Sequence, residues 1–183
     1  SALSAPQYRL TLYPRGGGTP WVIGKSKVEG EPEKKYSPDE VKSMIPLLRQ
    51  RNARGFEVYI TPMDDHNHYI VIDDVTDEKY KELITAGYKP NLMQESSENN
   101  KQAIFKIPKY KDKDEQSLAN NVVVKLNKKY GDPKFTGVVH AFRMAVFSNK
   151  KQGRNNAFTK IIATASGVCS NVLSMLKQEL DKV

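Results

Sequence analysis

Apolar and polar residues alternate along several short stretches of the chain, and this pattern predicts β-strands. The predicted strands are residues 7–14, 21–25, 56–62, 68–73, 90–97, 101–108 and the first part of 138–151. The run 68–73 is the most apolar, which is typical of a central strand. The turn sequence SENN between 90–97 and 101–108 predicts a β-hairpin.

Apolar residues spaced three to four positions apart, together with capping residues, predict helices between these strands. The predicted helices are residues 37–55, 76–88, 114–131 and 155–182. Ser37 and Thr76 are typical N-caps, and Pro46 is expected to kink or split the first helix. Helices that alternate with hairpin strands favour an α+β fold on a mixed or antiparallel sheet over a doubly wound parallel one.

The chain has 183 residues, which is enough for one domain with a sizeable core. No apolar run approaches the roughly 20 residues of a membrane span, and no signal peptide is recognisable. The single cysteine, Cys169, excludes an internal disulfide framework and a Cys-based zinc site. We therefore expect a cytoplasmic protein without a membrane partner.

Positive charge is concentrated in one part of the chain. The formal net charge is +8, and residues 101–160 contain 14 Lys and Arg against 4 Asp and Glu. A one-sided surplus of this kind suits phosphate binding, because neutralised phosphates release condensed counterions. The alternative is a solvated surface that provides solubility.

Two adjacent carboxylates, Asp73 and Asp74, come at the end of the most apolar strand. Neighbouring side chains on a regular strand point to opposite faces, so both can bind one ion only where the strand ends and the chain turns. A third acid, Asp132, lies in YGDPKF before the next predicted strand. Together they fit a divalent cation such as Mg²⁺, which accepts few carboxylates and takes other oxygens from substrate phosphates. Alternatively, Asp74 caps the next helix and Asp132 belongs to a turn.

The stretch FRMAVFSNKK carries an arginine on an apolar strand and then a group of polar and basic residues. These residues are Arg143, Asn149, Lys150 and Lys151, with Arg154 beyond them. Such a cluster can hold a triphosphate or a nucleic-acid backbone. A plain solvated loop is the alternative.

His66 and His68 indicate a different metal site. Histidines two positions apart on a strand point to the same face, which is the geometry of the HUH-type relaxases. Such sites usually have an apolar residue between the two histidines, whereas this chain has Asn67, and His140 alone remains as a third ligand. Solvated turn histidines are the alternative.

The order of the motifs EVYITP, HYIVIDDV, NLMQESSENNKQAIFKI, GDP and AFRMAVFSNKK resembles the RepB-type primases of mobilisable plasmids, of the archaeo-eukaryotic primase class. The resemblance extends from about Phe56 to Lys151. It implies an RRM-like α/β palm, a small additional α/β unit and a C-terminal helix. Residues 1–154 are then expected to be the catalytic domain, and 155–183 a helix that packs on it or leads to a further helical domain.

The resemblance also implies roles for individual residues. The family's catalytic metal ligands match Asp73, Asp74 and Asp132. Its nucleotide-facing positions match Ser96, Ser97, Lys101, Gln102, Arg143, Asn149, Lys150 and Lys151. The family commonly has a glycine before the phenylalanine of the last motif, where this chain has Ala145-Val146. A local shift of the backbone there would affect the role of Arg143.

The function implied by the resemblance is that of a DNA primase, a nucleotidyltransferase that synthesises primers on single-stranded DNA for plasmid replication. It would use nucleoside triphosphates and one or two Mg²⁺ or Mn²⁺ ions. Template would follow the basic residues, with Lys109, Tyr110 and Arg154 as contacts and Tyr110 as a stacking platform. A fused helical or relaxase/helicase domain is an expected partner. The alternatives are an HUH-type relaxase or rolling-circle initiator, and a non-catalytic module that binds single-stranded nucleic acid.

Overall fold

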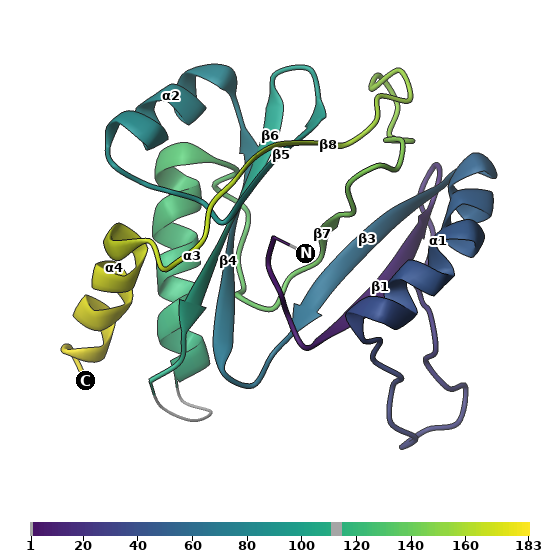
Figure 1. The fold of residues 1–183 in the computed structure, drawn as a ribbon, viewed down its shortest axis with the longest axis horizontal. Coiled ribbons are helices and arrows are strands. Elements are labelled where there is room, and N and C mark those ends of the chain that lie inside the picture. The colour runs from purple at the N-terminus through teal and green to yellow at the C-terminus, as the bar shows by residue number, and fades with distance from the viewer. Residues whose placement is uncertain (1, 111–114) are drawn as a thin grey trace. The chain divides into compact units, whose positions relative to one another are not determined.

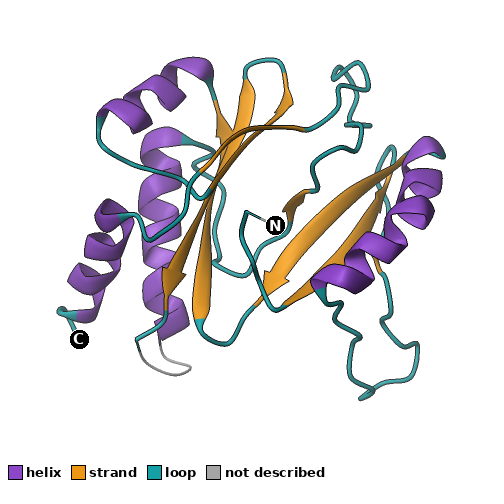
Figure 2. Cartoon of the chain, viewed as in Figure 1, coloured by secondary structure: helices purple, strands orange, loops and turns teal. Residues whose placement is uncertain are grey.

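The computed structural model describes residues 2–110 and 115–183, and Asp114, the first residue of one predicted helix, lies outside them. The described chain forms two compact units (Figures 1 and 2). The first unit consists of Leu3–Asp64 and Ala141–Thr159, and the second contains Asp65–His140 and Lys160–Val183. Each unit has its own four-stranded antiparallel sheet, which confirms the predicted α+β class. The assignment of residues 1–154 to a catalytic domain stays a prediction.

Most of the predicted elements are present, and residues 138–151 and 155–182 differ most from the prediction. The strands are β1 (Gln7–Pro14), β2 (Trp21–Val22), β3 (Phe56–Met63), β4 (Asn67–Val75), β5 (Leu92–Ser97), β6 (Asn100–Pro108), β7 (Phe142–Arg143) and β8 (Lys160–Thr164). The helices are α1 (Pro38–Ala53), α2 (Asp77–Thr85), α3 (Glu115–Tyr130) and α4 (Ser170–Leu180). None of these helices has the length and hydropathy needed to span a bilayer.

The first unit is a sheet of order β2-β1-β3-β7 with α1 lying along β1 and β3 (Figure 1). β1 and β3 pair over their full lengths, from Gln7 opposite Met63 to Pro14 opposite Phe56. The residues of one face are apolar and buried: Leu10, Leu12, Val58, Ile60 and Phe142. Because side chains alternate between the faces of a strand, Tyr13, Glu57, Tyr59 and Arg143 share the opposite face.

Helix α1 begins as predicted, because the Ser37 side chain accepts a hydrogen bond from the Glu40 amide. The prediction that Pro46 splits the helix is wrong, since α1 runs without interruption from Pro38 to Ala53, and a kink at Pro46 stays a prediction. A proline removes one intrahelical hydrogen bond. Buried Val41 before it and buried Leu48 after it hold both halves of the helix against the core.

The second unit is a sheet of order β4-β6-β5-β8. Its helix-covered face includes His68, Ile70 and Ile72 of β4, and the residues beside them on β6 include Phe105, which is fully buried. The Phe105 ring lies 6.2 Å from that of Tyr88, which in turn lies 5.6 Å from Tyr130 of α3. The other face carries Val71, Asp73, Gln94 and Gln102, because these residues alternate with those of the helix-covered face.

The helix predicted over residues 155–182 is wrong in its first part. Residues 160–164 form β8, an exposed edge strand that pairs with β5, and only Ser170–Leu180 are helical. In a run as short as 160–164, Ile161 and Ile162 fit both the helical and the strand period. β-branched residues favour a strand where a neighbouring strand is available. Helix α4 packs against α3, where Lys125 and Lys182 lower the pKa of the Glu179 carboxyl to about 2.

The strand predicted at the start of residues 138–151 is reduced to Phe142–Arg143, with Arg143 opposite Tyr59 of β3. The rest is a loop that the Asn52 side chain holds in place. Its Oδ1 accepts hydrogen bonds from the Ser148 amide and hydroxyl, and its Nδ2 donates to the Ser148 carbonyl. The Asn52 side chain thus satisfies backbone groups of Ser148, while the amides of Val146 and Asn149 donate to the carbonyls of Thr159 and Ala157.

Candidate functional site

The end of β4 contains a β-bulge at the two adjacent acids. Ile72 pairs with Ala103 and Val75 with Lys101, so that Asp73 and Asp74 together lie opposite Gln102. Asp74 has a φ of 52°. A bulge interrupts the alternation of faces, which removes the geometric objection to both acids serving one site. Thr76, and not Asp74, caps α2, since its hydroxyl accepts from the Lys79 amide.

The Asp73 carboxylate ends a chain of side-chain hydrogen bonds. Gln102 Nε2 donates to Asp73 Oδ1 at 2.8 Å, and Gln94 Nε2 donates to Gln102 Oε1 at 2.8 Å. Both glutamines are buried. Burial raises the pKa of the Asp73 carboxyl, the Gln102 hydrogen bond acts against this, and the charge of Asp74 raises it further. A cation would relieve the cost of holding this carboxylate ionised.

The Asp74 carboxylate has a different partner. Asn100 Nδ2 donates to Asp74 Oδ1 at 2.8 Å, and the Ser96 hydroxyl donates to Asn100 Oδ1 at 3.1 Å. The predicted Ser96 is thus linked to Asp74 through Asn100, while buried Ser97 pairs with Asn100 across the hairpin. The motif reasoning missed Asn100 and Gln94, because only the register of β5, β6 and the bulge brings them to the acids.

Lys101 is buried and paired with two carboxylates, those of Asp77 and Glu95. Burial by itself would lower the pKa of the Lys101 ammonium, but its hydrogen bonds and charge interactions with these two carboxylates raise it overall. Lys101 therefore joins the start of α2 to the β5–β6 hairpin. A phosphate group would have to compete with both carboxylates for this ammonium.

Asp132 is brought to Asp73 through the backbone. Its amide donates to the Asp73 carbonyl at 2.9 Å, and Asn127 Oδ1 accepts from the Asp73 amide at 3.0 Å. The Asp132 carboxylate itself accepts from the Lys134 amide at 2.9 Å. Among residues 2–110 and 115–183, no group of three or more His, Cys, Asp or Glu side chains is already arranged to hold a metal ion.

The histidines do not form the metal site of a relaxase. His66 precedes β4 and is exposed, whereas His68 is buried, with its Nε2 2.9 Å from Glu115 Oε1. Burial lowers the pKa of His68, and the neighbouring Glu115 acts in the opposite direction. The His140 ring lies against Phe135 at 4.1 Å. The alternative of a solvated turn histidine is also wrong for His68, which is a core residue satisfied by a carboxylate.

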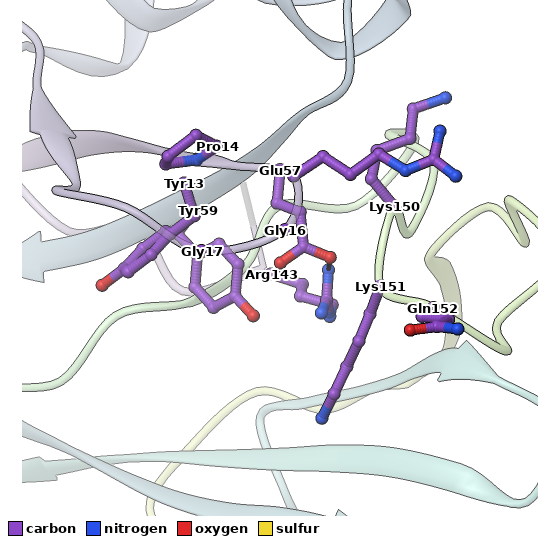
Figure 3. A pocket seen from close by; sticks show the side chains of 11 residues that line it. Tyr13, Pro14, Gly16, Gly17, Glu57, Tyr59, Arg143, Lys150, Lys151 and Gln152 are labelled. Atoms are coloured by element: carbon purple, nitrogen blue, oxygen red, sulfur yellow. Dashed lines mark hydrogen bonds and ion pairs between the residues drawn. The ribbon is translucent and has the colours of Figure 1, made fainter.

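A second concentration of functional groups lies in the first unit, around a pocket of about 610 Å³ (Figure 3). Arg143 donates to Glu57 Oε1 at 2.9 Å, and its guanidinium lies 5.1 Å from the centre of the Tyr59 ring. Lys150 and Lys151 also line the pocket. The buried Asn149 accepts from the Lys151 amide at 3.1 Å, so it shapes the turn that presents this lysine.

Two of the predicted DNA contacts lie apart from the acids within the second unit. Lys109 and Tyr110 follow the end of β6 that pairs with Asn67, at the opposite end of β4 from Asp73 and thus roughly 20 Å along the strand. Tyr110 is exposed, and the Lys177 ammonium lies 5.8 Å from its ring centre. Arg154 belongs to the other unit, in the loop that follows Lys151.

Comparison with known proteins identifies the family. Residues 7–178 match the RepB DNA-primase N-terminal domain. The chain belongs to this family. The match confirms the resemblance indicated by the motif order. It extends the resemblance to nearly the whole of this chain, including β1, β8 and most of α4.

Two curated relatives share substantial sequence with this RepB-type domain. A DNA primase of Acidithiobacillus ferrooxidans is 33% identical over 151 residues, which cover 82% of the chain and 43% of that protein. Mobilization protein A of Escherichia coli is 31% identical over 120 residues, which cover 64% of the chain and 16% of that protein. The chain thus matches less than half the length of either relative.

Solved structures support the same fold. The primase RepB' superimposes with a TM-score of 0.82 at 20% identity, over 99% of this chain and 59% of that one. The catalytic domain of RepB' in complex with initiator DNA also superimposes with a TM-score of 0.82. The identity is 19%, and the match covers 99% of this chain and 89% of that one. The AEP domain of the cyanophage S-2L primase-polymerase gives 0.60, at 13% identity and 93% and 89% coverage. These likenesses confirm the predicted archaeo-eukaryotic primase fold.

The departure from the family glycine is visible in the backbone. Val146 has a φ of 69°, and its amide donates to the Thr159 carbonyl at 2.9 Å. This left-handed region is rarely occupied by β-branched residues. Val146 therefore occupies a backbone conformation that a glycine adopts without strain. The effect of this departure on the role of Arg143 stays a prediction.

We expect Val146→Gly to raise the free energy of unfolding by about 1 kcal/mol. Relief of left-handed strain is worth of order 1–3 kcal/mol, while the added freedom of glycine in the unfolded chain costs about 0.5–1. Val146 is 58% exposed, so little apolar burial is lost. Urea denaturation measures the change, with Val139→Gly as the matched control: this valine is 53% exposed, lies outside the left-handed region, and should lose stability. A less stable Val146→Gly chain would contradict the strain argument.

Proposed function

We propose that the chain is the catalytic part of a DNA primase, which synthesises short primers on single-stranded DNA for plasmid replication in a metal-dependent, template-directed reaction. The family membership supports this, as does the DNA primase among the relatives. The solved complex of the RepB' catalytic domain with initiator DNA supports a DNA partner by analogy. The observation that carries the proposal is the bulge that presents Asp73 and Asp74 next to the backbone of Asp132.

Asp73 and Asp74 would hold the Mg²⁺ or Mn²⁺ ion, with Asp132 as the third ligand. Carboxylate oxygens are suitable donors, and Mg²⁺ needs only one or two of them besides water and substrate phosphates. The Asp132 carboxylate accepts a hydrogen bond from the Lys134 amide. It would have to turn away from this amide to become a metal ligand. The bound metal would neutralise charge on the triphosphate and lower the pKa of the attacking 3′-hydroxyl.

The surrounding residues would keep the two carboxylates in position. Gln102 donates to Asp73 and accepts from Gln94, and Asn100 donates to Asp74. Partners of this kind orient metal ligands and limit their motion. We assign a positioning role to Gln94 and Asn100, and we propose that Gln102 orients Asp73 in addition to facing the nucleotide.

Arg143, Lys150 and Lys151 would bind the phosphates of the incoming nucleotide, since charge-assisted hydrogen bonds to phosphate are strong. Asn149 would position Lys151 through its hydrogen bond to the Lys151 amide. Two groups of residues complete the proposal. Ser96, Ser97, Lys101 and Gln102 are proposed to face the nucleotide, and Lys109, Tyr110 and Arg154 to contact single-stranded template.

Primer synthesis from nucleoside triphosphates on single-stranded DNA tests this function directly. We expect labelled oligonucleotides in the presence of Mg²⁺, none after EDTA, and recovery when Mg²⁺ or Mn²⁺ is added in excess. Products formed equally well in EDTA would contradict the metal requirement. Salt-sensitive DNA binding without any synthesis would favour the non-catalytic module, and a covalent tyrosyl–DNA adduct would favour the relaxase.

A further inference from the structure

The pocket of the first unit has an aromatic end and a cationic end. Tyr13 and Tyr59 lie together on one side in Figure 3, and Lys150 and Lys151 lie on the other. The paired side chains of Glu57 and Arg143 lie between them. A nucleotide has the same sequence of chemical groups, namely an aromatic base, a polar sugar and a chain of phosphates.

The aromatic end is a firmly supported pair of rings. Tyr13 and Tyr59 have ring centres 4.7 Å apart at an interplanar angle of 58°. The Arg143 guanidinium lies over the Tyr59 ring and is itself fixed by Glu57. Both tyrosines are only half-buried, so part of each ring surface faces the pocket. Rings held in this way lose little entropy when a base stacks on them.

The cationic end provides charge for phosphates. Arg15, Arg143, Lys150 and Lys151 line the pocket together with one carboxylate, that of Glu57. Because Glu57 is paired with Arg143, Arg15, Lys150 and Lys151 provide the remaining positive charge. Gly16 and Gly17 border the same space, and a Cβ at either position would meet nothing within 4 Å. The loop thus leaves the pocket open on that side.

We propose that this pocket binds one nucleoside triphosphate, with its base stacked on Tyr13 and Tyr59. Its phosphates would bind Arg143, Lys150 and Lys151, together with Arg15. This rests on the proposed function and adds a base-binding subsite from β1 and β3. The volume of about 610 Å³ lies in the usual range for small-molecule sites. A template strand would need a longer groove that follows its backbone, so the dimensions favour a single nucleotide.

Equilibrium binding of ATP and of inorganic tripolyphosphate, without template or divalent metal, tests the subsite. Tyr59→Leu and Tyr13→Leu keep an apolar side chain of useful size but remove the ring. Each should weaken ATP binding about tenfold, as expected for the loss of one stacked base, and leave tripolyphosphate binding within about twofold. Tyr59→Phe should retain ATP binding. Lys151→Ala should weaken both ligands, because the phosphates are common to them.

Tyr80→Leu, a half-buried tyrosine on α2, is the matched control and should bind both ligands like the parent chain. Circular dichroism identifies any variant that does not fold, and the two tyrosine variants serve as independent tests. Unchanged ATP binding in both would overturn the proposal, and so would equal losses for ATP and tripolyphosphate. Weaker oligo-dT binding with unchanged ATP binding would assign the rings to template and also overturn it. Repeating the titrations in the Asp73→Asn chain separates this subsite from primer synthesis, because binding does not require turnover.

Discussion

Asp73→Asn is expected to lower the rate of primer synthesis by at least about 1,000-fold while the chain stays folded. The substitution removes a negatively charged ligand from the proposed metal site, and metal ions supply several kcal/mol of transition-state stabilisation. Each 1.36 kcal/mol corresponds to a factor of ten in rate. Asparagine keeps an oxygen that can accept from Gln102 Nε2, so the hydrogen bond to Asp73 Oδ1 has a replacement.

The measurement is the initial rate of primer synthesis at saturating nucleotide and Mg²⁺, with thermal unfolding as the check on folding. Glu78→Gln is the matched control, because it removes one negative charge from the exposed first turn of α2 and lies close by in the sequence. This control should retain nearly full activity. A fully active Asp73→Asn chain would falsify the assignment of the metal site.

Gly131→Ala is expected to reduce both stability and activity. A Cβ at this position would lie 2.3 Å from the Asp73 carbonyl oxygen, 2.6 Å from Ile72 Cγ2 and 2.9 Å from Asn127 Oδ1. The first of these atoms belongs to the backbone, so the end of α3 has to move away from β4. Overpacking of this kind costs about 1–3 kcal/mol, and sometimes more. We therefore expect a loss of about 3 kcal/mol in the free energy of unfolding.

The same substitution should lower primer synthesis by about 100-fold, since a displacement of about 1 Å at a catalytic group has an effect of this size. Gly137→Ala is the control, because Gly137 has a φ of 93° and nothing lies within 4 Å of its added Cβ. It should lose about 1 kcal/mol of stability through backbone strain without a matching loss of rate. Equal rates for the Gly131→Ala chain and the parent would show that the contact with Asp73 is unimportant.

Local features of the sequence were sufficient for most individual elements. Ser37 and Thr76 cap their helices as predicted, because a cap depends on a side chain and an amide three residues away. The hairpin turn also forms where SENN indicates it, with Asn99 at a φ of 53°. The failures occurred where distant partners decide the structure. Residues 160–164 became a strand because the edge of β5 was available, and α1 is not split at Pro46 because both halves of the helix are anchored.

In the proposed site, too, local sequence indicated the residues, whereas contacts between distant residues decided their arrangement. The sequence placed Asp73 and Asp74 after the most apolar strand and Asp132 before a later one, and the motif order identified the family. It did not reveal the bulge, the chain from Gln94 through Gln102 to Asp73, or the contact through Gly131. Those features depend on strand register and on helix–sheet packing between residues that are far apart in the sequence.

By itself, the amino-acid sequence determined the types of the elements, the family and the residue types available for metal and phosphate chemistry, because periodicity, capping and motif order are local or linear properties. Only the tertiary structure decided which of these groups meet. Tyr13, Tyr59 and Arg143 come from three strands, and pairing of those strands is what places them around one pocket. The Asp132 amide likewise donates to the Asp73 carbonyl where the end of α3 contacts β4, and Gly131 leaves room for this contact because a Cβ there would overlap the Asp73 carbonyl oxygen.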